Sequence, residues 1–157
     1  MADRYDRTRM LIGQEGIDRL QAAHVVVAGV GGVGSFAAEA LARAGVGALT
    51  LIDNDVVDIT NLNRQIHATM QTVGQPKVQV MAERLAAVAP ELQVHQKQAF
   101  LLADNTAEVL GEVRYDYIID AVDTVTAKLA LIQYALERNI PVISSMGTAN
   151  KLDATKF

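Results

Sequence analysis

Short apolar runs alternate with longer amphipathic segments along the chain. The apolar runs predict buried strands at residues 24–28, 49–52, 117–119 and 142–145, and residues 92–100 alternate like a further strand. Helical patterns cover residues 33–44, 76–89, 103–110 and 124–138, and residues 1–22 are expected to form an N-terminal helical arm. This alternation predicts an α/β, Rossmann-like fold, which is a mainly parallel sheet with helices on both faces.

Ligands of such sheets bind outside the carboxyl ends of the strands, at the point where the strand order reverses. Candidate chemistry is therefore expected just after Ala28, Ile52, Ile119 and Ser145. The glycine-rich and polar stretches of the sequence fall in these places.

A glycine-rich loop follows the first predicted strand. Its sequence, GVGGVG at residues 29–34, contains the pattern G-x-G-x-x-G and leads into a predicted helix. Glycines permit the tight turn and let backbone N–H groups approach a phosphate at the positive end of the helix. The alternative is a close-packed turn without a ligand, and the missing lysine excludes a P-loop. The candidate phosphate-binding residues are Gly29, Gly31, Gly32 and Gly34.

An aspartate, Asp53, ends the second predicted strand. It lies about twenty residues after the glycine-rich loop, near the spacing of a carboxylate that binds ribose hydroxyls. The alternative is an ordinary turn aspartate. A ribose carboxylate suits ATP and NAD equally, and it disfavours NADP because it would repel the additional phosphate.

A long polar segment at residues 54–65 distinguishes ATP from NAD. A dinucleotide-binding fold would usually begin its next helix sooner after Asp53. Arginine binds phosphate in a forked geometry, so this segment could serve a triphosphate. The alternative is a solvated loop with surface ion pairs. The candidates in the segment are Asp55, Asn61, Arg64 and Gln65.

A lysine, Lys77, follows Pro76 in the first turn of a predicted helix. A cation at this end opposes the helix dipole by roughly 0.3–1 kcal/mol. The lysine therefore either serves a phosphate or is an exposed cation whose cost is screened.

Two carboxylates, Asp120 and Asp123, follow the strand at residues 117–119. Carboxylates at a strand's carboxyl end suit a hard cation such as Mg²⁺ beside phosphates. The alternative is one strand-end aspartate and one aspartate that caps the next helix.

Composition narrows the possible functions. The 157 residues carry a net charge of −4 and include no cysteine and no tryptophan. Disulfides, a thiol nucleophile and cysteine-based zinc sites are therefore excluded. The acidic balance argues against non-specific DNA binding. The charged start and the lack of a span-length apolar run predict a soluble cytoplasmic protein without a membrane partner.

Taken together, these residues resemble the E1-like adenylating superfamily. The matching parts are the arginine-rich arm, the loop at 29–34, Asp53 and residues 61–65, 75–77 and 120–123. Within that superfamily the sequence is most similar to the tRNA threonylcarbamoyladenosine dehydratases. This narrower resemblance rests on four sequence motifs, at residues 63–68, 120–126, 144–147 and 150–153. The lack of a Cys-x-x-Cys motif agrees with it.

The resemblance implies an ATP-dependent reaction on tRNA. ATP would adenylate the carboxylate of the threonylcarbamoyl group and release pyrophosphate. A ureido nitrogen would then attack the activated carbonyl, and AMP would leave as a ring closes, with net loss of water. Proximity makes this second step easy.

The resemblance also implies residue roles. Gly31 and Gly32 would approach the phosphates, Asp53 would hold the ribose, and Arg64 and Lys77 would neutralise the triphosphate. Asp123 would ligate Mg²⁺ with support from Asp120. Arg7, or alternatively Arg9, would reach the ATP of a second protomer, which implies a homodimer. Relatives run past residue 157, so the chain is expected to be one ATP-binding domain, residues 1–157, truncated at its C-terminal side.

Three other functions compete with this one. A related enzyme would adenylate the C-terminus of a ubiquitin-like or sulfur-carrier protein. An NAD-dependent oxidoreductase would need a hydride-transfer site, and nothing after Asp120 suggests one. A non-catalytic module would bind ATP without forming AMP. The sequence leaves a sulfur-relay or desulfurase partner open.

Overall fold

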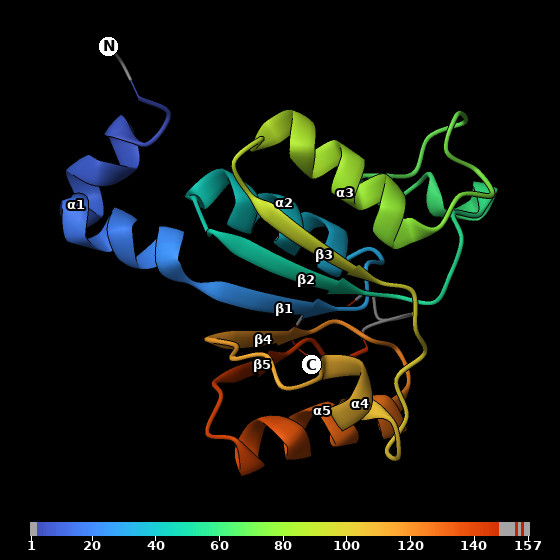
Figure 1. Cartoon of the computed structure of the whole chain (residues 1–157). Helices are drawn as coiled ribbons and strands as arrows, with labels where there is room; N and C mark the ends of the chain where they lie inside the picture. Colours follow the sequence, from blue (N-terminus) through green and yellow to red (C-terminus); the bar gives the residue numbers. More distant parts are fainter. Residues whose placement is uncertain (1–2, 148–152, 154, 156–157) are drawn as a thin grey trace.

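A five-stranded sheet forms the centre of the molecule, with the strand order β3-β2-β1-β4-β5 (Figure 1). The computed structural model describes residues 3–147, 153 and 155. All four pairs of neighbouring strands are parallel. The strands are β1 (His24–Ala28), β2 (Ala48–Ile52), β3 (Gln93–Lys97), β4 (Tyr117–Asp120) and β5 (Val142–Ser144).

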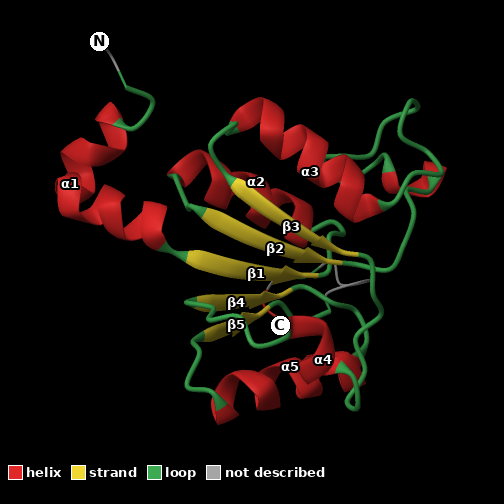
Figure 2. Ribbon diagram, in the orientation of Figure 1, coloured by secondary structure: helices red, strands yellow, loops and turns green. Residues whose placement is uncertain are grey.

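Helices cover both faces of this sheet, as Figure 2 shows. They are α1 (Asp6–Ala22), α2 (Gly34–Ala44), α3 (Lys77–Val88), α4 (Thr106–Leu110) and α5 (Val125–Glu137), with a 3₁₀ turn η1 (Ile59–Asn61). Helices α2 and α3 lie on one face, and α4 and α5 lie on the other. The predicted Rossmann-like α/β fold is confirmed.

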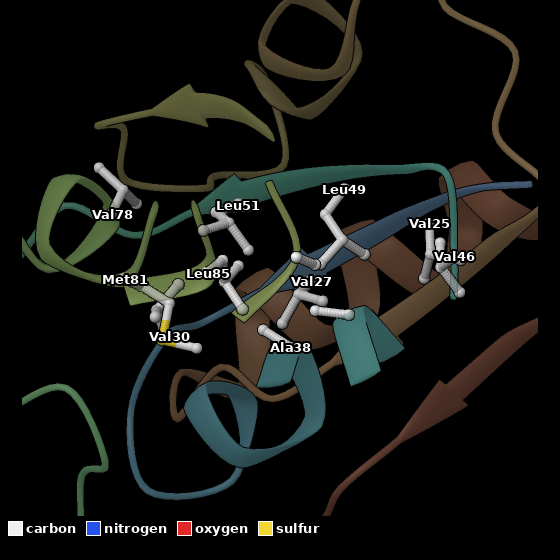
Figure 3. Packing of buried hydrophobic residues seen from close by; sticks show 12 residues of the cluster. Val25, Val27, Val30, Ala38, Val46, Leu49, Leu51, Val78, Met81 and Leu85 are labelled. Carbon is white, nitrogen blue, oxygen red and sulfur yellow. The ribbon is translucent and has the colours of Figure 1, made fainter. Parts of the chain in front are cut away.

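The alternation of side chains along β1 divides the core into two clusters. Val25 and Val27 pack with residues of α2 and α3, such as Ala38 and Met81 (Figure 3). Val26 faces the other side and packs with α4 and α5. Because β1 is buried on both faces, its sequence is a continuous apolar run rather than an alternating one.

The N-terminal arm differs from a continuous helix. Helix α1 begins at Asp6 and is interrupted at Gly13, whose backbone (φ 72°, ψ 175°) is not helical. The arm projects away from the sheet beyond the amino ends of the strands (Figure 1). Met10 and Leu11 on this arm are each 86% exposed.

Several predicted boundaries were wrong. Strand β3 ends at Lys97 rather than at residue 100, because its pairing partner β2 ends at Ile52. Helix α4 begins at Thr106 rather than at residue 103, since the Asn105 side chain accepts the Leu102 N–H (2.8 Å) and forms a turn first.

Capping also differs in detail. Pro76 precedes α3 in an extended conformation, so Lys77 is the first helical residue. Thr124 occupies the N-cap position of α5 but makes no capping hydrogen bond with its side chain. Over the described residues, no helix has both the length and the hydropathy to cross a bilayer.

Candidate functional site

A cleft of about 570 Å³ lies at the carboxyl ends of the strands, where the strand order reverses between β1 and β4. This position and volume are those of a small-molecule site in a doubly wound sheet. The cleft brings together most of the predicted site residues, namely Gly29, Gly31, Gly32, Asp53, Asp55, Asn61, Arg64, Gln65, Lys77 and Asp123.

The glycine-rich loop has a closed side and an open side. A Cβ on Gly29 (φ +84°) would lie 2.5 Å from the Ala121 carbonyl oxygen, and a Cβ on Gly34 would collide with the Gly29 carbonyl. Gly34 is buried at the start of α2 and is absent from the cleft lining. A Cβ on Gly31 or Gly32 would instead meet only atoms of Gln65 and Arg64, at 3.5 Å or more. Two glycines therefore build the loop, and two leave its surface free for a ligand.

Asp53 braces this loop from the end of β2. Its Oδ2 accepts the Val30 N–H (2.7 Å), and its Oδ1 accepts the Asp55 N–H (2.8 Å). Burial raises the pKa of the Asp53 carboxyl, and the two N–H donors oppose this shift. Since a carboxylate has about four lone-pair sites, Asp53 retains capacity for hydroxyl donors in the cleft.

Two cations border the same side of the cleft. Lys77 is 6% exposed, and its Nζ lies 2.8 Å from Asp55 Oδ2. Arg64 is exposed, and its Nη1 donates to the Thr60 carbonyl (3.1 Å) and to Asn63 Oδ1 (2.9 Å). Both side chains can neutralise a bound polyanion, and Arg64 keeps free donors for it.

The polar segment after Asp53 folds through η1 toward the cleft. Asn61 is buried, and its Oδ1 accepts the Asp58 N–H (3.0 Å) in a capping box. Gln65 and His67 are buried, at 6% and 2% exposure. Within the described part of the chain, Gln65 Oε1 and both ring nitrogens of His67 lack a hydrogen-bond partner. Burial, with Lys77 and Arg84 nearby, lowers the pKa of His67 to about 4.

The two aspartates after β4 have different surroundings. Asp123 is exposed in the cleft, and no hydrogen bond or ion pair engages it among the residues described. Asp120 is fully buried beside Lys128 (3.1 Å) and is absent from the cleft lining. The structure therefore does not bring Asp120 to the predicted metal position, since protein donors occupy its carboxylate.

Asp53, Asp55 and Asp123 all line the cleft, and Asp123 is the one whose carboxylate no described residue engages. The described residues hold no cluster of three or more histidine, cysteine or acidic side chains. Mg²⁺ is commonly held by one or two carboxylates together with substrate phosphates, and Asp123 fits that kind of site.

The predicted arm residue Arg7 lies outside the cleft of its own protomer. It is on α1, beyond the opposite ends of the strands (Figure 1). Arg7 is exposed and makes no polar contact with the part of the chain that is described, whereas Arg9 pairs with Asp3 and Asp6. Of the two arginines, Arg7 is therefore the one without a polar partner among the described residues.

Sequence reasoning missed two parts of the site. The wall formed by Ala99, Phe100 and Leu101 follows β3, which is also a carboxyl end of a parallel strand. Lys128, which lies behind the cleft as the buried partner of Asp120, was missed as well. A lysine on the apolar face of a predicted helix was the available signal for it.

The geometry defines a class: an α/β protein with a glycine-lined, polar cleft at the topological switch point of its sheet. The sequence profile of the ThiF family matches residues 5–157, and the chain belongs to that family.

Three relatives illustrate the similarity. A tRNA threonylcarbamoyladenosine dehydratase of Bacillus subtilis (strain 168) is 51% identical over 100% of this chain and 61% of its own length. The crystal structure of the Escherichia coli tRNA N6-threonylcarbamoyladenosine dehydratase in complex with ATP has a TM-score of 0.91 and 46% identity, over 97% of this chain and 62% of that one. A sulfur carrier protein adenylyltransferase of Thermus thermophilus is 36% identical over 90% of this chain and 52% of its own length. The chain thus spans less than two thirds of each relative.

Proposed function

We propose that this chain is the ATP-binding, adenylating part of a tRNA threonylcarbamoyladenosine dehydratase. The observation that carries the proposal is the cleft, where an open glycine loop, Asp53 and two cations converge. The similarity to dehydratases, one of them in complex with ATP, supports the substrate assignment.

The proposed reaction has two steps. A carboxylate oxygen of the threonylcarbamoyl group attacks the α-phosphorus of ATP, and the bond to pyrophosphate breaks. A ureido nitrogen then attacks the acyl carbon and loses its proton, and AMP leaves with the former carboxylate oxygen. The ring closes, and the nucleoside has lost the elements of water.

The side chains of the cleft have separate roles in this proposal. The backbone at Gly31 and Gly32 contacts phosphate oxygens, and Asp53 accepts the ribose hydroxyls. Asp55, Asn61 and Gln65 complete the nucleotide site. Arg64 and Lys77 stabilise the charge that develops on the departing pyrophosphate.

Asp123 is the proposed ligand of Mg²⁺, either directly or through water. The ion would supply charge neutralisation on the phosphates. Arg7 is proposed to reach the nucleotide of a second protomer, which makes the active form a homodimer. We propose a cytoplasmic location, which agrees with a tRNA substrate.

Thermal unfolding of the purified chain with Mg-ATP, and separately with NADH, tests the nucleotide assignment. A ligand at a hundred times its dissociation constant adds about 2.7 kcal/mol. We expect stabilisation by Mg-ATP alone, followed by AMP formation that depends on threonylcarbamoyl-modified tRNA. Stabilisation by NADH alone would return the chain to the oxidoreductases.

A second candidate is adenylation of a sulfur-carrier protein, favoured by the similarity to the Thermus thermophilus adenylyltransferase. Pyrophosphate exchange that requires such a carrier, and does not respond to tRNA, would select this candidate. ATP binding without AMP formation in either assay would indicate a non-catalytic module.

A further inference from the structure

A buried ion pair lies directly behind the cleft. Asp120 at the end of β4 is 0% exposed, and Lys128 in the second turn of α5 is 6% exposed. Lys128 Nζ lies 3.1 Å from Asp120 Oδ2, and neither residue lines the cleft. The nucleotide-binding roles proposed above do not use this pair.

The pair holds the two segments that form the β4 and β5 side of the cleft. Asp120 Oδ1 accepts the Val122 N–H (3.1 Å), in the loop of residues 121–124 that carries Asp123. Asp120 Oδ2 accepts the Ser144 hydroxyl (2.5 Å) at the end of β5. Lys128 Nζ donates to the Ser145 carbonyl (2.6 Å), where the second segment, residues 145–147, begins.

All of these hydrogen bonds involve the Asp120 carboxylate or the Lys128 ammonium. Ser145 also donates its N–H to the Asp120 carbonyl (2.8 Å), so Asp120 binds the second segment through backbone and side chain. Residues Ala121 to Thr124 and Ser145 to Gly147 all line the cleft. A shift of either charged group therefore moves both walls of this side.

The β4 and β5 side of the cleft, formed by residues 121–124 and 145–147, borders the part of the cleft that the proposed nucleotide position does not fill. The nucleotide candidates Gly31, Asp53, Arg64 and Lys77 lie on the loop after β1 and the segment after β2. A ligand that crosses the switch point extends from there toward β4 and β5. Under the proposed function, Asp123 marks the phosphate end of the nucleotide, and the lining residues beyond it on this side, such as Met146, are the ones left for the second substrate.

We propose that Asp120 and Lys128 form a positioning pair that sets the acceptor side of the cleft, by fixing residues 121–124 and 145–147 relative to each other. The proposal rests on the proposed function, because it assigns that side to the tRNA carboxylate. Burying two charges costs desolvation free energy, and apolar residues of similar size would fill the same space without that cost. Its directional donors and acceptors hold two backbone segments that apolar contacts would not fix.

The test variant is Lys128→Arg, which keeps the charge but replaces a compact ammonium with a planar fork. Arg84→Lys is the matched control. Arg84 pairs with Glu39, a carboxylate 6% exposed, in a contact between α3 and α2. Neither Arg84 nor Glu39 lines the cleft.

Two measurements separate this proposal from the proposed function. The first is amide hydrogen exchange, which requires no activity. Lys128→Arg should accelerate exchange at residues 121–124 and 145–147 by about tenfold, or roughly 1.4 kcal/mol of local opening free energy, and leave β2 unchanged. Arg84→Lys should leave both segments at the wild-type rate.

The second measurement is tRNA-dependent AMP formation. Because misplacement of about 1 Å can cost roughly a hundredfold in rate, we expect Lys128→Arg to lower kcat by roughly ten- to a hundredfold. Because residues 121–124 carry Asp123, the proposed Mg²⁺ ligand, stabilisation by Mg-ATP should weaken in Lys128→Arg, whereas binding of metal-free ATP in EDTA should stay at the wild-type value. Wild-type exchange at both segments, or a normal kcat despite faster exchange, would overturn the proposal. A wild-type chain without AMP formation would refute the proposed function, and the exchange data would still decide whether the pair fixes the walls.

A second variant guards against misfolding of the first. Asp120→Leu combined with Lys128→Met removes both charges and leaves neither buried alone, which proteins often tolerate. It should fold, bind Mg-ATP and show the same faster exchange at both segments. Wild-type exchange in this double variant would overturn the proposal equally.

Discussion

The ends of β2 and β4 carry aspartates in nearly equivalent places, yet the two carboxylates have different uses. Ile52 and Asp120 both pair with Ala28 of β1, and Asp53 follows Ile52 directly. Asp53 accepts backbone N–H groups and faces the cleft, whereas Asp120 is enclosed by Lys128 and Ser144. The two carboxylates thus differ in that side-chain donors of the protein engage Asp120, whereas Asp53 accepts only backbone N–H groups and lines the cleft.

Other buried polar groups near the ends of β2 and β4 differ in the same way. On the β2 side, Gln65 lines the cleft, and its buried Oε1 has no hydrogen-bond partner among the residues described. On the β4 side, the side chains of Asp120 and Lys128 are engaged by Val122, Ser144, Ser145 and each other. Polar groups of Asp53 and Gln65 at the β2 end thus line the cleft, whereas the β4 end is stabilised internally at Asp120.

The largest expected effect is a loss of stability when the buried ion pair at the end of β4 is disrupted. Asp120→Ala leaves the Lys128 ammonium buried without its counter-charge, which should lower the free energy of unfolding by about 3–5 kcal/mol. Asp53→Ala removes two hydrogen bonds from a carboxyl that burial already penalises, so we expect a loss of only about 1 kcal/mol. Urea unfolding of both variants measures the difference. Equal losses would contradict the distinction between the two ends.

The next effect concerns turnover on the β2 side. Arg64→Ala removes a cation proposed to act on the leaving pyrophosphate, and loss of one such donor typically costs about 10²–10³ in kcat. The folded state should be unaffected because Arg64 is exposed. Single-turnover AMP formation by active protein measures the loss. Arg114→Ala, an exposed arginine before β4, is the control, and a near-normal rate for Arg64→Ala would remove its proposed role.

A smaller effect is a pH dependence that originates at His67. Its pKa is about 4 in the folded protein against 6.5 in a model peptide. As the pH falls below 6.5, the unfolded chain binds a proton that the folded chain does not, so stability decreases toward pH 4. Between pH 7 and pH 4.5 this should remove about 2 kcal/mol.

Comparison with His67→Gln isolates this contribution from the titration of carboxylates. The variant should lose less stability over the same pH interval, as measured by urea unfolding at each pH. An identical pH profile for the two proteins would show that His67 is not held neutral.

The smallest expected effect distinguishes the two sides of the glycine loop. Gly31→Ala adds a methyl group 3.7 Å from the nearest side chain, so the fold should tolerate it. The methyl group would occupy ligand space, and we expect a dissociation constant for Mg-ATP raised about tenfold, or 1.4 kcal/mol. Titration calorimetry measures the change. Unchanged affinity would mean that the phosphates do not approach Gly31.

Most of the fold could be predicted because its signals are local. The bounds of β1 were predicted correctly, since a β-branched run buried on both faces has no polar interruption. The glycine loop and Asp53 were recognised from spacing along one chain segment. The difference between Asp120 and Asp123 could not be predicted in this way, because it depends on Lys128 and Ser144, which only the folded chain brings together.

The position of β1 between β2 and β4 has a consequence for the order of folding. Pairing β1 with β2 joins His24 to Ala48, 24 residues apart, whereas pairing with β4 joins Val26 to Ile118, 92 residues apart. The longer closure costs about 1.2 kcal/mol more in chain entropy. The half of the sheet that carries the glycine loop is therefore expected to assemble first, and it provides the template on which the half with the buried ion pair is added.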